Sequence, residues 1–272
     1  AVEARKKGLI NRVILTGNSF QIRELINSLG VDCDGFEIRH AENTAEAAIL
    51  AVRSIGEGSA DILVKGNLDS SLYFKAILDK EKGLRRSELL SNVTVFELPS
   101  YHKLLAVTDN AIVLQPSLAQ KQLIIENTKS LFDALEIPQA KVAVVAAVEK
   151  ENSMMPATTD AVELREMNRS GKLEGFIIDG PLGYDACICA KSAAKKGIKS
   201  AVAGDPDLLL MPNLEAANIL GKAYKYHGDA LSGGVVLGAQ VPVVLNSRSD
   251  SCKRRLNSLL LAKAMVQTGT TH

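Results

Sequence analysis

Short apolar runs recur along the whole chain, and several of them are continuous rather than alternating with polar residues. A continuous run of this kind suits a strand that is buried on both faces, as in a parallel sheet covered by helices. The runs are residues 13–15, 62–64, 93–96, 104–107, 142–146, 176–178, 208–210 and 241–245. Helix-like segments lie between and after them, at 45–55, 118–135, 161–167, 186–196, 214–226 and 255–266. This alternation of strands and helices predicts an α/β fold.

Length and composition limit what such a fold could do. The chain of 272 residues can form two domains or one large α/β unit. Its 32 Lys+Arg nearly balance its 31 Asp+Glu, which gives no support to a nucleic-acid or membrane partner. No apolar run approaches the length of about 20 residues that spans a bilayer, and no signal peptide is expected. Four scattered cysteines predict reduced thiols in a cytoplasmic protein, and no metal site is expected.

Small or polar residues follow almost every predicted strand. The clearest cases are the segments 16–19, 65–71, 108–110 and 179–182. In open α/β sheets ligands bind at the carboxyl ends of the strands, so these segments are suited to build a site there. Turns are polar in most proteins, however, and these segments by themselves leave both interpretations open.

The turn Ser247-Arg248-Ser249-Asp250-Ser251 joins the last predicted strand to the last predicted helix. Free N–H groups and the positive dipole end at a helix start favour an anion, and the planar guanidinium of Arg248 matches a phosphate with two hydrogen bonds. One hypothesis is therefore a site for a phosphate or an acyl phosphate. The turn by itself favours the alternative, in which Asp250 or Ser251 caps the helix and Arg248 is only solvated.

Nucleotide-binding and hydrolase motifs are missing from the sequence. Residues 16–19 follow the first strand without the Gly-x-Gly-x-x-Gly pattern, and there is no P-loop. Ser247 has neither a Gly-x-Ser-x-Gly elbow nor a nearby His, which argues against a serine-hydrolase triad. Gly233, Gly234 and Gly238 surround a short apolar run and are interpreted as backbone space near the site or as a turn.

A second distinctive segment, residues 179–185, places a Gly-Pro turn after a buried strand with an acid on either side. Asp185 is expected to cap a helix that begins at Ala186. Asp179, at the end of the strand, is the better candidate for a functional site.

Several segments occur in an order and spacing that are specific when taken together. They are residues 60–66, 76–80, 83–85, 108–109, 155–158, 179–185, 213–218 and 242–251. With these segments the chain resembles the phosphate acetyl/butyryltransferase family over residues 9–266, and its butyryl branch most of all. The N-terminus is expected to be short, because relatives usually carry another helix before the strand at 13–15.

The resemblance implies an enzyme that interconverts an acyl-CoA and inorganic phosphate with an acyl phosphate and free CoA. It implies two α/β domains, each with a mainly parallel sheet, and an active site in the cleft between them, similar to the isocitrate and isopropylmalate dehydrogenases. Domain 1 would comprise residues 1–100 with 236–272, and domain 2 residues 101–235. CoA and phosphate would be substrates, without a tightly bound cofactor, and a homodimer or higher homo-oligomer is expected.

The same resemblance implies the functional residues. Ser247 would hydrogen-bond the reacting carbonyl or thiol, Arg248 would hold the phosphate, and Asp250 is a third catalytic candidate. The candidates for binding phosphate and CoA are Lys65, Gly66, Asp179, Gly180, Ser251 and Arg254.

The family's proposed base, an Asp seven residues after the serine, is replaced here by Arg254. A cationic surround of Arg248, Lys253 and Arg254 could supply a CoA thiolate directly, because a thiol of this kind has a pKa of about 8.5. Alternatively, Asp250 or Asp179 takes the proton. The acetyl-type sequence Ser-Arg-Gly-Cys-Ser is also replaced, by Ser-Arg-Ser-Asp-Ser, which favours a butyryl or branched C4–C5 acyl group.

Two other functions stay open. One is a non-catalytic protein that binds acyl-CoA or acyl phosphate, for which the substitution at Arg254 is the single indication. The other is an NAD-dependent hydroxyacid dehydrogenase with a similar cleft, although the carboxylate pairs of its metal site are missing from the sequence.

Overall fold

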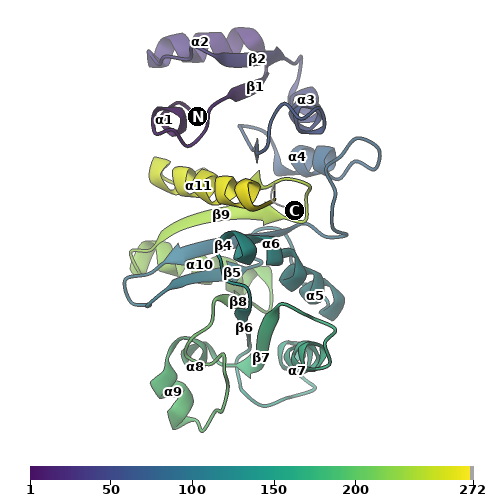
Figure 1. Cartoon of the computed structure of the whole chain (residues 1–272), viewed down its shortest axis with the longest axis vertical. Helices are drawn as coiled ribbons and strands as arrows, with labels where there is room; N and C mark the ends of the chain where they lie inside the picture. The colour runs from purple at the N-terminus through teal and green to yellow at the C-terminus, as the bar shows by residue number, and fades with distance from the viewer. Residues whose placement is uncertain (270–272) are drawn as a thin grey trace.

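The computed structural model describes residues 1–269, which fold into alternating helices and strands (Figure 1). The helices are α1 Val2–Lys6, α2 Ser19–Leu29, α3 Thr44–Gly56, α4 Ser70–Ile77, α5 Leu118–Asn127, α6 Lys129–Ala134, α7 Pro156–Arg169, α8 Tyr184–Ile188, α9 Ala190–Lys195, α10 Leu214–His227 and α11 Cys252–Gly269. The strands are β1 Val13–Gly17, β2 Phe36–His40, β3 Leu63–Val64, β4 Ser91–Glu97, β5 Leu104–Thr108, β6 Ala140–Val145, β7 Phe176–Leu182, β8 Leu208–Leu210, β9 Leu231–Leu237 and β10 Val243–Val244. The predicted α/β class is confirmed.

One large sheet forms the centre of the molecule. Its 8 strands lie in the order β3-β10-β9-β4-β5-β8-β6-β7, and β1 pairs with β2 in a separate parallel sheet. β3 and β10 are parallel, as are β5, β8, β6 and β7, whereas β9 and β4 are antiparallel to their neighbours. The described residues thus form one large, mostly parallel sheet and a small one, whereas the family resemblance implied a mainly parallel sheet in each of two domains.

The division into residues 1–100 with 236–272, and 101–235, stays a prediction. β4 and β5 lie on either side of the expected boundary at residue 100 and pair within the large sheet. β9 spans the other expected boundary, at residue 235. β10 belongs to the segment that was expected to return to the first part, and it does pair with β3.

Strand pairing gives the large sheet two strand directions. β3, β10 and β4 run one way, and β9, β5, β8, β6 and β7 run the other, because three successive antiparallel pairs separate β10 from β5. The segments after β3 and β10 therefore leave the sheet at the opposite end from the segments after β5 and β7. The polar strand ends that the sequence suggested as one site are divided between the two ends.

The continuous apolar runs in β4, β6 and β8 are buried on both faces, as predicted, whereas the run in β1 is only partly buried. In β8, Leu208 and Leu210 belong to a core with residues of α5, α6 and α7, and Leu209 belongs to another with residues of α8 and α10. All three leucines are at most 1% exposed. Alternate side chains thus fill the two layers between the sheet and its helices.

The helices differ from the prediction in two places. The expected helix 118–135 is two helices that meet at Thr128, whose hydroxyl donates to a carbonyl of the preceding turn. The expected helix 186–196 is also two, and Asp185 lies inside α8 and pairs with Lys196 (2.7 Å) instead of capping a helix at Ala186. None of the helices within residues 1–269 is long and apolar enough to cross a bilayer.

The sequence pattern did not predict α1, α2, α4, β2 or β9, and for β9 the physical reason is the clearest. Of the two interpretations of Gly233 and Gly234, backbone space near the site or a turn, the turn was wrong, since both glycines lie inside this central strand. A Cβ at Gly233 would stand 2.9 Å from the carbonyl carbon and oxygen of Asn257 in α11. Glycine is therefore required for the close packing of α11 on β9 rather than for a turn.

We expect Gly233→Ala to lower the free energy of unfolding by about 1–3 kcal/mol, because the added methyl group meets backbone atoms that cannot rotate away. Urea unfolding measures the change. Gly56→Ala, at a position where a Cβ would meet nothing within 4 Å, is the control and should cost far less. Equal effects of the two substitutions would contradict this account of the packing.

A cluster of charges holds the β4–β5 hairpin to the segment before β8. Asp205 Oδ1 lies 2.9 Å from Lys103 Nζ and 2.8 Å from His102 Nε2, and Asp205 Oδ2 lies 2.5 Å from Lys141 Nζ. Partial burial alone would raise the pKa of Asp205, but hydrogen bonds from Lys141, Lys103 and His102 outweigh it and lower that pKa.

The pKa of Asp205 is lower in the folded than in the unfolded chain. The ionised carboxylate of Asp205 therefore stabilises the fold above its unfolded-state pKa of about 3.9, and this stabilisation is lost as the pH falls. Asp205→Asn should lower the free energy of unfolding at pH 7 by up to about 1 kcal/mol, since the side chain is 39% exposed and screened by solvent. Urea titrations between pH 7 and pH 3 should show this difference shrinking in acid. A difference that grows in acid would contradict the assignment.

Candidate functional site

Residues 245–251 connect β10 to α11 and form a tight turn. The Asp250 N–H donates to the Ser247 carbonyl oxygen (3.1 Å), and the Ser247 N–H donates to Asp250 Oδ2 (2.9 Å). The Oγ atoms of Ser247 and Ser249 lie 3.0 Å apart. Both serines and Arg248 are exposed. The turn therefore presents two hydroxyls and a guanidinium to solvent on a backbone fixed by its own hydrogen bonds.

Arg248 is free to bind a ligand. Its carbonyl oxygen accepts from Arg255 Nη2 (3.4 Å), but its guanidinium has no hydrogen-bond or ion-pair partner within residues 1–269. It precedes α11, a helix of 18 residues whose first N–H groups carry partial positive charge. An unpaired guanidinium at this place suits a phosphate or another anion.

Asp250 faces inward, unlike its neighbours. Its Oδ1 accepts from Lys225 Nζ of α10 (3.1 Å), and its Oδ2 accepts from the Ser247 N–H. The side chains of Lys225 and Asp250 are 19% and 7% exposed. Both carboxylate oxygens are thus occupied, and the role of Asp250 as a base stays a prediction.

Ser251 and Arg254 are engaged within the protein. Ser251 Oγ accepts from the Arg254 N–H (3.3 Å), so Ser251 caps α11 and Asp250 does not. The Arg254 side chain donates from Nη2 to the carbonyl oxygen of Lys225 (3.2 Å). The contact of Ser251 and Arg254 with phosphate or CoA stays a prediction.

Sequence reasoning did not select two residues that hold the turn, Lys225 and Arg255. Arg255 donates from Nε to the Asp250 carbonyl oxygen (3.2 Å) and from Nη2 to the Ser247 carbonyl oxygen (3.3 Å). Arg255 belongs to the basic run Lys253-Arg254-Arg255 that follows the turn in the sequence. Lys225 had no such signal, because its partner lies 25 residues further along the chain.

Lys65 and Gly66 lie close to the start of the turn. The Lys65 N–H donates to the Val244 carbonyl oxygen (3.0 Å), and β3 and β10 are parallel and in register. Both strands therefore end side by side. The structure brings residues 65–66 next to the segment that leads into Ser247, as a shared site would need.

Asp179 and Gly180 lie elsewhere. β7 is the edge strand opposite β3, and β9, β4, β5, β8 and β6 lie between β10 and β7. Arg165 Nη1 donates to the Gly180 carbonyl oxygen (2.8 Å) and lies 3.9 Å from Asp179 Oδ1. A Cβ at Gly180 would stand 2.7 Å from the Val144 carbonyl oxygen, so packing explains this glycine. The structure does not bring these two residues to the turn.

Asp109, of the motif Thr108-Asp109, is buried at the carboxyl end of β5. Its Oδ1 accepts from the N–H groups of Ala111 (2.8 Å) and Ile112 (2.9 Å), and its Oδ2 from that of Asn92 (2.9 Å). Burial raises the pKa of Asp109, although these N–H groups act in the opposite direction. The bonds indicate that Asp109 fixes the backbone where β5 ends.

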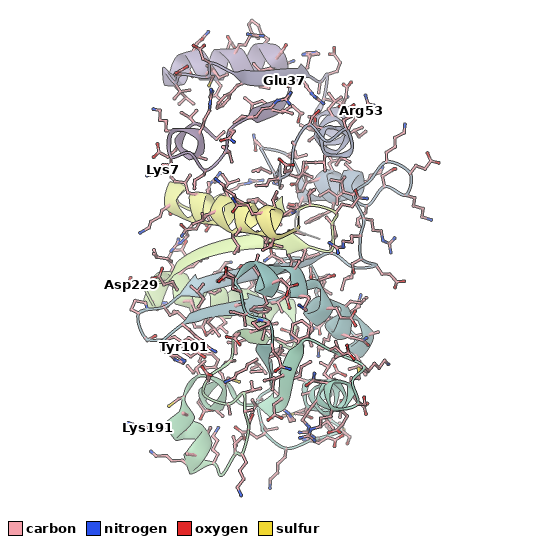
Figure 2. All side chains as sticks on the ribbon, viewed as in Figure 1. Lys7, Glu37, Arg53, Tyr101, Lys191 and Asp229 are labelled. Atoms are coloured by element: carbon pink, nitrogen blue, oxygen red, sulfur yellow. The ribbon has the colours of Figure 1, made fainter. Side chains whose placement is uncertain are left out.

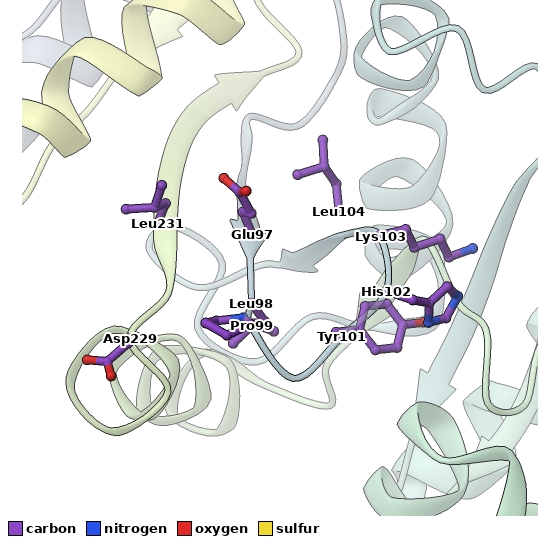
Figure 3. A pocket seen from close by; sticks show the side chains of 9 residues that line it. All are labelled: Glu97, Leu98, Pro99, Tyr101, His102, Lys103, Leu104, Asp229 and Leu231. Carbon is purple, nitrogen blue, oxygen red and sulfur yellow. The ribbon is translucent and has the colours of Figure 1, made fainter.

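A cavity of about 440 Å³ opens at the tip of the β4–β5 hairpin. Its lining comprises residues 97–99 and 101–104 with Asp229 and Leu231, and Figure 3 shows these side chains. Tyr101 and Asp229 lie on the same side of the molecule (Figure 2). The predicted site residues do not line this cavity. Within residues 1–269, no group of three or more His, Cys, Asp or Glu is placed to hold a metal ion.

A family model described as "Phosphate acetyl/butaryl transferase" matches residues 35–263. The chain belongs to this family. It is 38% identical over 262 residues to the phosphate butyryltransferase of Clostridium acetobutylicum, covering 96% of this chain and 87% of that protein. It is 39% identical over 217 residues to the phosphate acetyltransferase of Thermotoga maritima, covering 80% and 74%. A branched-chain phosphotransacylase from Enterococcus faecalis has a similar structure, with a TM-score of 0.81 at 29% identity over 94% of this chain and 98% of that one.

As a member of the phosphate acetyl/butyryl transferase family, the chain is an acyltransferase, which confirms the family and enzyme class predicted from the sequence. Membership favours acyl transfer over the NAD-dependent dehydrogenase that the sequence left open. Relatives named for butyryl and for acetyl transfer match at similar identity, so identity alone does not choose the acyl group.

Ser251→Ala should lower the free energy of unfolding by about 1 kcal/mol, because the N–H of Arg254 loses its cap. Ser251→Asn keeps a capping side chain and should preserve stability. Urea unfolding measures both, and thiol-release assays on the same samples test for a second role. If Ser251 only caps α11, Ser251→Asn keeps the KM for phosphate, whereas a large increase would show that the hydroxyl binds phosphate.

Proposed function

We propose that this chain transfers a butyryl or branched C4–C5 acyl group between CoA and inorganic phosphate at the turn 247–251. The observation that carries the proposal is the exposed pair of Ser247 and Arg248 at the start of α11, with a guanidinium that has no partner within the described residues. Residues 65–66 lie beside the same strand end. This arrangement fits a reaction in which an anion must be held next to a polarised carbonyl group.

In the proposed reaction Arg248 holds phosphate through two parallel hydrogen bonds. A phosphate oxygen attacks the thioester carbonyl carbon while the Ser247 hydroxyl donates a hydrogen bond to the carbonyl oxygen, where negative charge develops. A carbon–oxygen bond forms and the carbon–sulfur bond breaks. The CoA thiolate leaves and takes a proton from solvent, and the proton of the attacking hydrogen phosphate passes to solvent. No covalent bond to the protein is required.

In the reverse direction the nucleophile is the CoA thiolate, which attacks the carbonyl carbon of the acyl phosphate and displaces phosphate. Asp250 is committed to Lys225 and to the Ser247 N–H, and Arg254 replaces the family's acid. The exposed cations Arg248 and Lys253 would stabilise the thiolate, whose unperturbed pKa of about 8.5 already allows partial ionisation near neutral pH. Positioning therefore contributes more than proton transfer.

We further propose that the acyl group and CoA lie in a cleft between residues 1–100 with 236–272 and residues 101–235. The return of β10 to β3 supports this arrangement, because it places the turn on the first of these parts. The 29% identity and TM-score of 0.81 to a branched-chain phosphotransacylase support both the fold and a branched or C4 acyl group.

The direct test mixes butyryl-CoA, isobutyryl-CoA or acetyl-CoA with phosphate and follows free thiol. We expect phosphate-dependent thiol release, faster with the C4 substrates than with acetyl-CoA. No phosphate-dependent release from any of them would refute acyl transfer. Binding of acyl-CoA without release would instead support the non-catalytic binding protein.

Arg248→Ala should raise the KM for phosphate by about 10- to 100-fold and lower kcat, because a hydrogen bond to a charged group contributes about 1.5–3 kcal/mol. Arg23→Ala removes an exposed arginine of α2 and is the matched control. Steady-state kinetics at varied phosphate measure the effect. If the two variants behave alike, Arg248 does not hold phosphate.

A further inference from the structure

The C-terminus of α10 meets the N-terminus of α11 beside the turn 247–251. Lys225 lies in the last turn of α10, where carbonyl groups lose their partners within the helix. Its carbonyl oxygen accepts from Arg254 Nη2 (3.2 Å), so an orphan acceptor at the negative end of one helix is satisfied by a cation from the other. The two helix ends are thus joined by a charge-assisted hydrogen bond.

The side chain of Lys225 makes a second connection. Its Nζ lies 3.1 Å from Asp250 Oδ1, and the two side chains are 19% and 7% exposed. The other Asp250 oxygen accepts from the Ser247 N–H (2.9 Å). The ammonium group of Lys225 therefore acts on the backbone of Ser247 through one intervening carboxylate.

We propose that Lys225 is a positioning residue for phosphate binding. It acts by clamping the turn that carries Ser247 and Arg248. This inference rests on the proposed function, and it assigns to α10 a part in the site that the sequence did not reveal. The clamp consists of Lys225, Asp250 and Arg254. It accounts for Asp250 and Arg254, two candidate residues whose polar groups make hydrogen bonds within the protein.

The clamp also gives a physical role to the substitution at Arg254. An Asp at this position would place a carboxylate against the carbonyl end of α10, which is unfavourable, whereas Arg254 donates to it. The residue that would have supplied a base thus fixes the turn instead. Asp250 is held as the partner of Lys225 and is not exposed to solvent as Ser247 and Arg248 are.

The test compares Lys225→Met with Lys225→Arg, and uses Lys222→Met as control. Lys222 is exposed on α10 less than one turn away, and it is not part of the site. Hydrogen–deuterium exchange follows the amides of residues 245–251, and thiol release at varied phosphate gives kcat and KM. Lys225→Met should speed exchange in the turn and raise the KM for phosphate about 10- to 100-fold, as expected for misplaced binding groups.

Rescue separates positioning from general destabilisation. Lys225→Arg keeps a cation for Asp250 and should restore both the slow exchange and most of the phosphate affinity, and Lys222→Met should resemble the unchanged chain. If Lys225→Met does not fold, Lys225→Gln takes its place, because it keeps a donor without the charge. Either unchanged exchange in the turn or an unchanged KM for phosphate in the Lys225 variant would overturn the proposal.

The two proposals fail in different ways. An unchanged chain that releases no thiol with phosphate refutes the proposed acyl transfer. The exchange measurement then decides the clamp by itself, since faster exchange in Lys225→Met and not in Lys222→Met supports it, and equal exchange refutes it. An active chain whose Lys225→Met variant keeps its KM for phosphate refutes the clamp and leaves acyl transfer standing.

Discussion

The insertion of β10 between β3 and β9 is the pairing on which the candidate site depends. β10 has two residues, yet its backbone accepts the Lys65 N–H and lies parallel to β3 on one side and antiparallel to β9 on the other. This pairing brings the C-terminal part of the chain back beside residues 63–66. It also determines where the turn 247–251 begins and in which direction it leaves the sheet.

The packing of α11 follows from the same arrangement. α11 lies along β9, and Gly233 leaves room for the backbone of Asn257 to approach the strand closely. With its body fixed on β9, α11 begins beside the last turn of α10, where Lys225 and Arg254 meet. The position of Ser247 and Arg248 therefore depends on the packing of α11 against β9 and on its contact with the end of α10.

Sequence reasoning predicted the parts of this structure that depend on local pattern. Continuous apolar runs identified β8 as a strand buried on both faces, and the turn 247–251 stood out because hydroxyls and an arginine precede a helix. β9 was missed because its Gly233 is needed for close packing against α11, and the local sequence does not reveal that contact. The direction of the strands was also hidden, so Asp179 and Lys65 were placed in one site although they lie near opposite edges of the sheet.

The contacts of the turn could not be read from spacing either. Nothing local indicates that Lys225 would reach Asp250, or that Arg254 would find a free carbonyl at the end of α10. Both contacts join segments that are distant in sequence, and their formation depends on how two helices end against each other. The local pattern and the resemblance to a family both pointed to the turn, whereas the structure shows which of its side chains are free and which are held.

The most direct test of the central claim is a crystal structure of the chain with bound phosphate. We expect phosphate at the turn, with two hydrogen bonds from the Arg248 guanidinium and with Ser247 Oγ beside it. Phosphate bound elsewhere, for example near Asp179 at the opposite edge of the sheet, with the turn vacant, would contradict it.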